Sequence, residues 1–256
     1  MDRVVLFRYH KKPLICRSRL RLIRKFNPRI KIFGLYGGKE SQFPKYQKYL
    51  GSFFEHNYCI KGKSNNWKWK NSDLAIKLWY KSIGKKIEFD MLHVIEWDLL
   101  LFDSLDKIYK KIPENSLGLT ALTPYKNVEN KWFKPFRGEW IKLLKYAQDK
   151  YSYNGKPQAA LGPGFCLPKK FLEKYSEIQV PVLCNDELRL ALFGQIFKHK
   201  LINTGFYLKW FDFVGELLFN CRGKEIPLAL IRRELKKKGG KRSFHPFRKR
   251  LKKSML

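Results

Sequence analysis

The chain has 256 residues, of which 44% are hydrophobic and 16% aromatic, so it can bury a substantial core and is not a disordered polycation. Its 54 basic and 22 acidic residues give a formal net charge of +32, which predicts a surface that attracts polyanions, anionic lipid headgroups or phosphorylated substrates. The five cysteines are odd in number and widely spaced, without the spacing of a zinc site, and this favours reduced, mostly buried thiols.

The first half of the sequence alternates strand and helix patterns, because short apolar runs separate segments whose apolar residues recur every three or four positions. In chain order, the patterns predict a strand at 3–9, a helix at 14–26, a strand at 31–38, a helix at 73–83, a strand at 89–95, a helix at 103–112 and a strand at 116–122. Residues 39–71 show no regular pattern. Ser72 is placed to cap the second helix, and Asp103 or Ser104 to cap the third.

The second half is less regular. Its patterns predict a helix at 138–151, a strand followed by a helix at 161–175, and helices at 185–197 and 225–240. The alternation of strands and helices favours an α/β fold with a largely parallel sheet. We expect one domain over residues 1–231 and a basic tail over 232–256, in which Glu234 is the single acidic residue. The tail is expected to close on the site or to contact a membrane surface.

The stretch IEFDMLHVIEWDLLL, residues 87–101, ends an apolar strand with two carboxylates. One residue separates Glu96 from Asp98, so on extended chain both side chains point to the same side. Ligands of an open parallel sheet bind outside the carboxyl ends of its strands, and two oxygen ligands there suit a Mg²⁺ or Mn²⁺ ion that also holds phosphate oxygens. The alternative is an ordinary polar strand end, with Asp98 capping the next turn. His93, inside the strand, is expected to be structural.

The order of segments resembles the nucleotide-sugar glycosyltransferases of the GT-A fold. Their D-x-D motif ends a core strand that follows a helix with a polar N/D-x-A start and a Gly. NSDLAIKLWYKSIGKKIEFDMLHVIEWDLLL, at 71–101, has this order with E-x-D in place of D-x-D, a conservative change for a hard cation. RVVLFRYH, at 3–10, stands where the family has its first strand. LGPGFCLPKKFLEKY, at 161–175, looks like the acceptor-side strand and helix, and CNDELRLALF, at 184–193, like a late helix that opens with an acidic pair.

The resemblance implies a single GT-A-like, Rossmann-related domain and a metal-dependent glycosyltransferase, and it favours an inverting one. Asp98 would be the principal ligand of Mn²⁺ or Mg²⁺, and Glu96 would bind the metal, its waters or the ribose. His245 would be a further metal ligand. Asp186 would be the catalytic base, with Glu187 in reserve; the alternative is that both acids only stabilise a helix N-terminus.

The resemblance also implies a binding site for a nucleoside-diphosphate sugar. Its candidate residues are Arg8, Asp73, Lys77, Glu96, Arg248 and Lys249. Asp73 and Lys77 alternatively form an ion pair across one helical turn. Three tryptophans, Trp67, Trp69 and Trp210, are considered for stacking on sugar rings, although packing explains each of them as well.

The expected acceptor is a glycan or a lipid-linked precursor. No apolar segment has the length of a signal peptide core or a membrane span, so we expect a cytoplasmic protein, with peripheral contact to the anionic inner membrane face as an option.

The competing hypothesis is a basic nucleic-acid-binding protein or metal-dependent nuclease, because cationic and aromatic residues suit phosphate tracking and base stacking. No nucleic-acid-binding signature is visible, so nucleic acid is not the expected partner. A third possibility is an inert member of the same fold.

Overall fold

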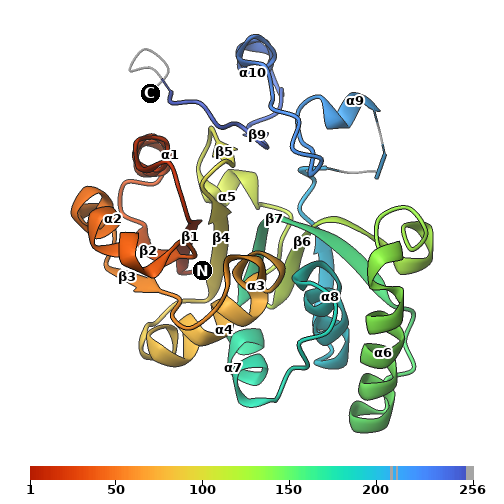
Figure 1. The fold of residues 1–256 in the computed structure, drawn as a ribbon. Helices are drawn as coiled ribbons and strands as arrows, with labels where there is room; N and C mark the ends of the chain where they lie inside the picture. The colour runs from red at the N-terminus through yellow and green to blue at the C-terminus, as the bar shows by residue number, and fades with distance from the viewer. Residues whose placement is uncertain (208–209, 212, 252–256) are drawn as a thin grey trace.

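Seven strands form the central sheet of the computed structural model, which describes residues 1–207, 210–211 and 213–251. The strands are β1 (Arg3–Tyr9), β2 (Lys31–Tyr36), β3 (His56–Cys59), β4 (Met91–Glu96), β6 (Ser116–Pro124), β7 (Gln158–Pro168) and β8 (Lys200–Asn203). Their order across the sheet is β3-β2-β1-β4-β7-β6-β8 (Figure 1). β1 is parallel to β2 and β4, β2 to β3, and β6 to β8, whereas β7 is antiparallel to both of its neighbours. The predicted α/β class with a mostly parallel sheet is confirmed.

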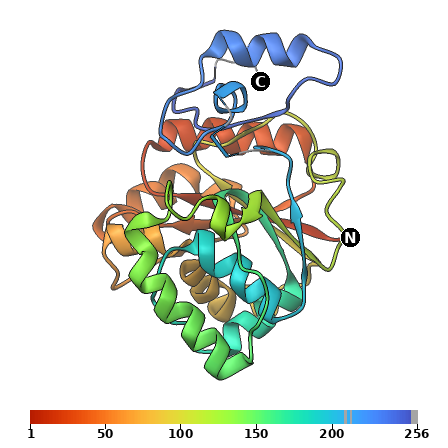
Figure 2. The ribbon, with the colours of Figure 1, turned by 90° about the vertical axis from the view of Figure 1, so that its right-hand side faces the viewer.

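Helices cover both faces of this sheet (Figure 1, Figure 2). The helices of the described residues are α1 (Pro13–Phe26), α2 (Phe43–Leu50), α3 (Asn65–Lys70), α4 (Ser72–Ser82), α5 (Leu105–Ile108), α6 (Arg137–Tyr151), α7 (Lys169–Glu177), α8 (Asp186–Ile196), α9 (Phe213–Glu216) and α10 (Leu228–Lys236), of which α9 and α10 lie away from the sheet. β1 shows the division between the faces, because its side chains alternate. Val5 and Phe7 join the apolar cluster of α1 and α2, whereas Val4 and Leu6 join that of α4, α7 and α8.

Some local predictions are corrected by the structure. Ser72 does not cap α4: the N-cap residue is Asn71, and the Ser72 hydroxyl donates to Asp186 Oδ2 instead. Ser104 does cap α5, because its hydroxyl accepts from the Lys107 amide. The helix predicted at 103–112 is nevertheless shorter, since the chain leaves helical geometry at Tyr109, whose buried hydroxyl donates to the Gly164 carbonyl. The segment predicted to be irregular contains α2, β3 and α3.

The cysteine and His93 predictions agree with the structure. The five thiols are unpaired; Cys16, Cys59, Cys166 and Cys184 are buried and Cys221 is partly exposed. His93 is fully buried, with Nε2 2.8 Å from an Arg3 guanidinium nitrogen, and burial lowers its pKa well below the ordinary value. A neutral imidazole in the sheet interior is a packing residue.

The C-terminal part of the described chain packs onto α1. β9 (Ser243–Phe244) pairs with β5 (Leu100–Leu101) in a two-stranded sheet. The C-terminal segment, with α10, lies beyond α1 (Figure 2). Apolar side chains join the two parts in a third cluster that includes Leu22, Phe102, Ile231, Phe244, Phe247 and Leu251. Arg19 of α1, itself buried, donates to the Phe247 and Lys249 carbonyls at 2.6 and 2.9 Å. The boundary expected after residue 231 falls inside α10.

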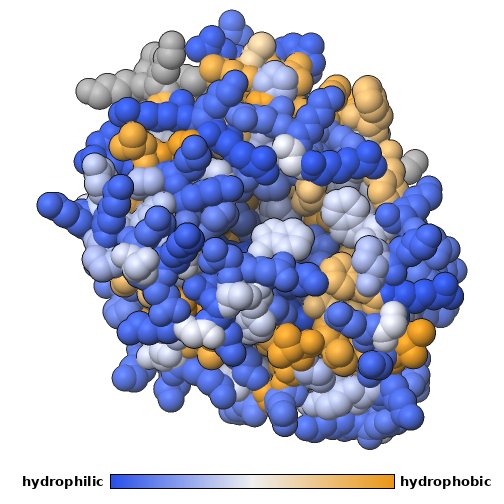
Figure 3. Space-filling model, viewed as in Figure 1, coloured by the Kyte–Doolittle hydropathy of each residue, from blue (hydrophilic) through white to orange (hydrophobic). Residues whose placement is uncertain are grey.

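The visible surface is mostly hydrophilic (Figure 3), in keeping with the large excess of lysine and arginine. In the described part of the chain, no helix combines the length and the apolar character that crossing a membrane requires.

Candidate active site

Two adjacent parallel strands bring Arg8 and Glu96 together. The register pairs Arg8 of β1 with Glu96 of β4 at the carboxyl ends of both strands. Arg8 Nη1 lies 3.8 Å from Glu96 Oε1, and Arg8 Nη2 donates to the carbonyls of Lys68 and Trp69 at 3.0 and 3.2 Å. The predicted strand-end position of Glu96 is therefore correct, and α3 is tied to it through Arg8.

Asp98 contacts the C-terminal segment. Its Oδ1 lies 3.5 Å from His245 Nε2, and its Oδ2 accepts from Arg248 Nε at 3.1 Å. The Asp98 carbonyl also accepts from the Phe247 amide at 2.8 Å, which fixes the backbone of the two segments. Burial tends to raise the pKa of Asp98, but the hydrogen bonds and charges of His245 and Arg248 lower it to about 2. Asp98 is thus an anion at neutral pH.

The ring orientation of His245 follows from its other contact. Nδ1 lies 2.7 Å from the Asn220 carbonyl oxygen, which only accepts, so Nδ1 carries a hydrogen. Nε2 faces Asp98 Oδ1: when Nε2 carries a hydrogen it donates to the carboxylate, and when it carries none its lone pair faces the carboxylate. Two acceptors 3.5 Å apart, Nε2 and Asp98 Oδ1, are stabilised by a proton or a cation between them.

Glu96 and Glu187 are both held by main-chain amides of β7. Glu96 Oε2 accepts from the Gly164 amide and Glu187 Oε1 from the Gly162 amide, each at 3.1 Å. Glu96 Oε1 is buried and accepts no hydrogen bond from the described residues. Burial raises the pKa of Glu96 to about 7. The pKa of Glu187 is also raised to about 7, chiefly by burial and then by the charge of Asp186.

Gly164 needs to be glycine. Its φ of +76° lies in the left-handed region, and a Cβ there would come within 2.5 Å of the Phe206 ring. The left-handed backbone and the Phe206 ring therefore exclude a side chain at Gly164, whose amide donates to Glu96.

The acidic pair opens α8 as predicted. Asp186 Oδ2 accepts from the Ser72 hydroxyl, and Asp186 Oδ1 accepts no hydrogen bond from the described residues. Glu187 Oε2 accepts from Trp132 Nε1 and Asn185 Nδ2, both at 3.0 Å. Burial raises the pKa of Asp186. Asp186 is therefore the less constrained acid of the pair.

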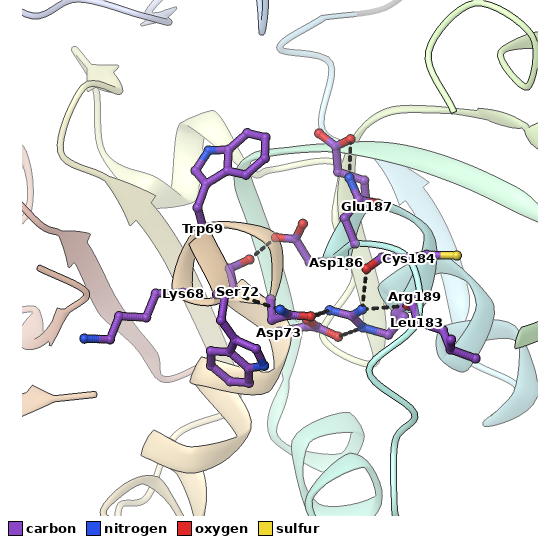
Figure 4. Close-up of polar contacts among 12 residues, drawn as sticks. Lys68, Trp69, Ser72, Asp73, Leu183, Cys184, Asp186, Glu187 and Arg189 are labelled. Atoms are coloured by element: carbon purple, nitrogen blue, oxygen red, sulfur yellow. Dashed lines mark hydrogen bonds and ion pairs between the residues drawn. The ribbon is translucent and has the colours of Figure 1, made fainter. Parts of the chain in front are cut away.

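A buried ion pair anchors α8 to α4 (Figure 4). The Arg189 guanidinium donates to both Asp73 oxygens at 2.6 and 2.8 Å, and neither side chain is exposed. Arg189 also donates to Asn71 Oδ1 and to the Leu183 and Cys184 carbonyls, while the Tyr175 hydroxyl donates to Asp73. These bonds satisfy both charges and hold the first turns of α4 and α8 together.

The structure brings together most of the predicted site residues. Arg8, Glu96, Asp98, His245 and Arg248 meet at the ends of β1 and β4, and Asp186 and Glu187 approach from α8. Asp73 instead pairs with Arg189, and Lys77 donates to the Ile178 carbonyl, so both have packing contacts. Lys249 is exposed, and its carbonyl accepts from Arg19. A role in donor binding for these three stays a prediction.

Several residues of the site were not found from the sequence. Ser72, Asn220 and Arg189 act through partners far away in the chain, and Ser72 and Asp186 are 114 residues apart. One signal was present in the sequence: Arg189 lies three positions after Asp186, within the run LRLALF, whose other residues are all apolar. A buried arginine needs an anionic partner.

The side chains fit a divalent cation as part of a larger ligand set. Asp98 Oδ1 and His245 Nε2 offer one oxygen and one nitrogen, and Glu96 Oε1, which accepts no hydrogen bond from the described residues, lies at the same strand end. Within 1–207, 210–211 and 213–251, no group of three or more His, Cys, Asp or Glu side chains lies close enough to hold a metal. Mg²⁺ and Mn²⁺ commonly take other ligands from phosphates. The donor set suits an ion that shares the oxygens of a bound diphosphate.

No protein-family model matches this sequence, and no curated protein matches it. Among solved structures, the galactosyltransferase LgtC in complex with donor and acceptor sugar analogs is similar with a TM-score of 0.40 and 13% identity, over 78% of this chain and 72% of that one. An active-site mutant of LgtC gives 0.40 and 12% over the same shares. Mouse xyloside xylosyltransferase 1 in its apo form gives 0.41 and 11%, over 78% and 84%. Scores this low establish neither a shared fold nor a shared activity.

Proposed function

We propose that this protein is a glycosyltransferase that moves a sugar from a nucleoside-diphosphate sugar to a glycan or lipid-linked acceptor, with Mn²⁺ or Mg²⁺. The observation that carries the proposal is the meeting of Asp98 and His245 at the carboxyl end of β4, with Arg8 and Arg248 beside them. Anionic and neutral metal ligands flanked by two guanidinium groups suit a diphosphate and its cation.

Four residues near β4 would hold the donor and its cation. Asp98 Oδ1 and His245 Nε2 would hold the cation, which when bound would stabilise negative charge on the leaving diphosphate. Arg248 would exchange its contact with Asp98 for one with a phosphate oxygen, since its side chain is 41% exposed. Arg8, fixed by two carbonyls of α3, would contact the nucleotide at the end of β1.

Asp186 would act as the base. Its Oδ1 would take the proton from an acceptor hydroxyl while that oxygen bonds to the anomeric carbon and the bond to the diphosphate oxygen breaks. The electron pair leaves with the diphosphate. In-line attack of this kind inverts the anomeric configuration, which the product's NMR spectrum reveals. The positively charged surface would favour an anionic glycan or membrane-associated acceptor.

The substitution Asp98→Asn tests this function. It keeps the side-chain shape but removes the charge that faces His245 and Arg248, so we expect metal-dependent hydrolysis and transfer from the active donor to fall roughly 100-fold or more. The measurement is release of UDP, GDP, CMP or TDP from a panel of their sugars, with and without Mn²⁺. Thermal unfolding shows whether the variant is folded.

Asp149→Asn serves as the control, because Asp149 lies exposed on α6, outside the site. Full turnover by Asp98→Asn would contradict the proposal. It would also be contradicted if no nucleotide sugar of the panel stabilised the wild-type protein or served as its donor.

A further inference from the structure

One of the seven tryptophans stands apart from the others. Trp79, Trp97 and Trp140 are buried, and Trp67, Trp132 and Trp210 are partly buried against the apolar clusters. The side chain of Trp69 is 67% exposed. Its ring makes no aromatic, cationic or hydrogen-bonding contact with the described residues. An indole left in water forgoes the free energy that burial would give, and a ring stacked on it would recover part of that free energy.

The backbone of Trp69 is fixed although its ring is free. It lies in the last turn of α3, a helix capped by the Ser64 side chain, and its carbonyl accepts from Arg8 at 3.2 Å. Its neighbour Lys68 is buried and donates through Nζ to the Gly38 carbonyl at 3.0 Å. The ring is therefore held on a rigid base, which limits the entropy lost when a ligand stacks on it.

The ring is also on the side of the site that holds the two acids. Figure 4 shows the Trp69 indole extending from α3 to the same side as the Asp186 and Glu187 carboxylates, whereas Lys68 extends the other way. The Ser72–Asp186 hydrogen bond joins α4, which follows α3 directly, to α8. Arg8 connects Trp69 in turn to Glu96. The indole thus extends toward the side of Asp186 and Glu187 from a helix whose main chain Arg8 ties to Glu96.

We propose that Trp69 is a stacking platform for a pyranose ring at the reacting end of the site. This inference rests on the proposed glycosyltransferase function. A flat apolar ring face suits the C–H face of a pyranose, and the unpaired indole N–H can donate to a sugar hydroxyl. The sugar belongs to the donor or to the acceptor, and both share this chemistry. Trp69 contributes binding and orientation; proton transfer belongs to the acids.

Trp69→Ala and Trp69→Phe test the platform by steady-state kinetics. We expect Trp69→Ala to raise KM for one substrate about fivefold, with kcat changed less than about twofold, because a stacking contact of about 1 kcal/mol is lost from both ground and transition state. Trp69→Phe keeps an aromatic face and should restore KM to within about threefold. Tyr49→Ala, at an exposed aromatic on α2, should match wild type. Thermal unfolding should be nearly unchanged throughout.

Tryptophan fluorescence identifies which sugar is stacked. The wild-type protein is titrated in Mn²⁺ with UDP, then with UDP-galactose, UDP-glucose, UDP-xylose and GDP-mannose, and with methyl glycosides in the presence of UDP. A change seen with a nucleotide sugar but not its nucleotide, and absent from Trp69→Phe, assigns the donor ring. A Trp69-dependent change that appears with a methyl glycoside assigns the acceptor ring.

Three results would overturn the inference. An equal Trp69-dependent change with UDP alone would place a nucleobase on the indole. Wild-type turnover with unchanged KM in Trp69→Ala would remove the platform and leave the glycosyltransferase function intact. A wild-type protein that neither binds nor hydrolyses any nucleotide sugar would remove the function and the platform together.

Discussion

Glu187 is a carboxyl group kept in an environment that favours its protonated form. Burial raises its pKa from an ordinary 4.5 to about 7, even though Trp132, Asn185 and the Gly162 amide all donate to it. A pKa raised by folding means that the folded state binds the proton more tightly than the unfolded state does. The stabilisation is complete below about pH 4.5 and is lost as the pH rises through about 7.

We therefore expect Glu187→Gln to flatten this pH dependence. The amide cannot ionise, so the variant should gain stability relative to wild type between pH 5 and 8, by up to about 3 kcal/mol. Urea unfolding at several pH values measures the difference. The exposed Glu173→Gln on α7 is the matched control and should leave the wild-type slope unchanged. A wild-type slope retained in Glu187→Gln would show that another group is responsible.

At the scale of single residues, the sequence predicts where a residue lies within a strand or helix better than it predicts which residues it contacts. Glu96 and Asp98 were located at a strand end because an apolar run and its polar exit are adjacent in the chain. That Asp98 meets His245 was expected only from the family resemblance, and that Ser72 meets Asp186 was not expected at all. Contacts across the fold depend on how elements pack, which local patterns do not contain.

At the scale of elements, the buried Asp73–Arg189 pair fixes how α4 and α8 meet. Removing one partner leaves the other charge buried and unpaired, so Arg189→Met should cost about 3–5 kcal/mol in free energy of unfolding. Replacing both residues, as in Asp73→Leu with Arg189→Met, should cost clearly less than the sum of the single changes. Chemical denaturation of the three variants measures this coupling. Additive losses would mean that the pair contributes as two independent side chains.

The same elements show what periodicity does and does not provide. α1, α4, α6 and α8 were predicted within a residue or two. In α1, α4 and α6 an apolar side repeats every three to four positions, whereas α8 is apolar on nearly all sides. The antiparallel placement of β7 between β4 and β6 and the pairing of β5 with β9 could not be predicted. A strand pattern carries no information about its neighbour or its direction.

At the scale of the whole molecule, the site depends on residues from both ends of the described chain. A chain shortened to residues 1–240 lacks His245, Arg248 and the buried side chains Phe244, Phe247 and Leu251. It should lose the response to Mn²⁺ and about 3–5 kcal/mol of stability, since it exposes Leu22 and Phe102. Thermal unfolding and nucleotide-sugar hydrolysis check both effects. A chain shortened to 1–251 is the control, and unchanged Mn²⁺ response in the 1–240 chain would contradict the role of His245.

The Gly162 and Gly164 amides of β7 affect which sequence changes the site can tolerate. Gly162 and Gly164 are two residues apart, so their nitrogens are separated by at most about 7 Å, and each holds one glutamate. The distance between the two carboxylates is thus fixed by backbone amides and not by side chains. Substitutions around the site can accumulate without moving the acids relative to each other, whereas inserting or deleting one residue between the two glycines would displace one acid. The length of main chain between Gly162 and Gly164 therefore sets the distance between the points where Glu96 and Glu187 are held.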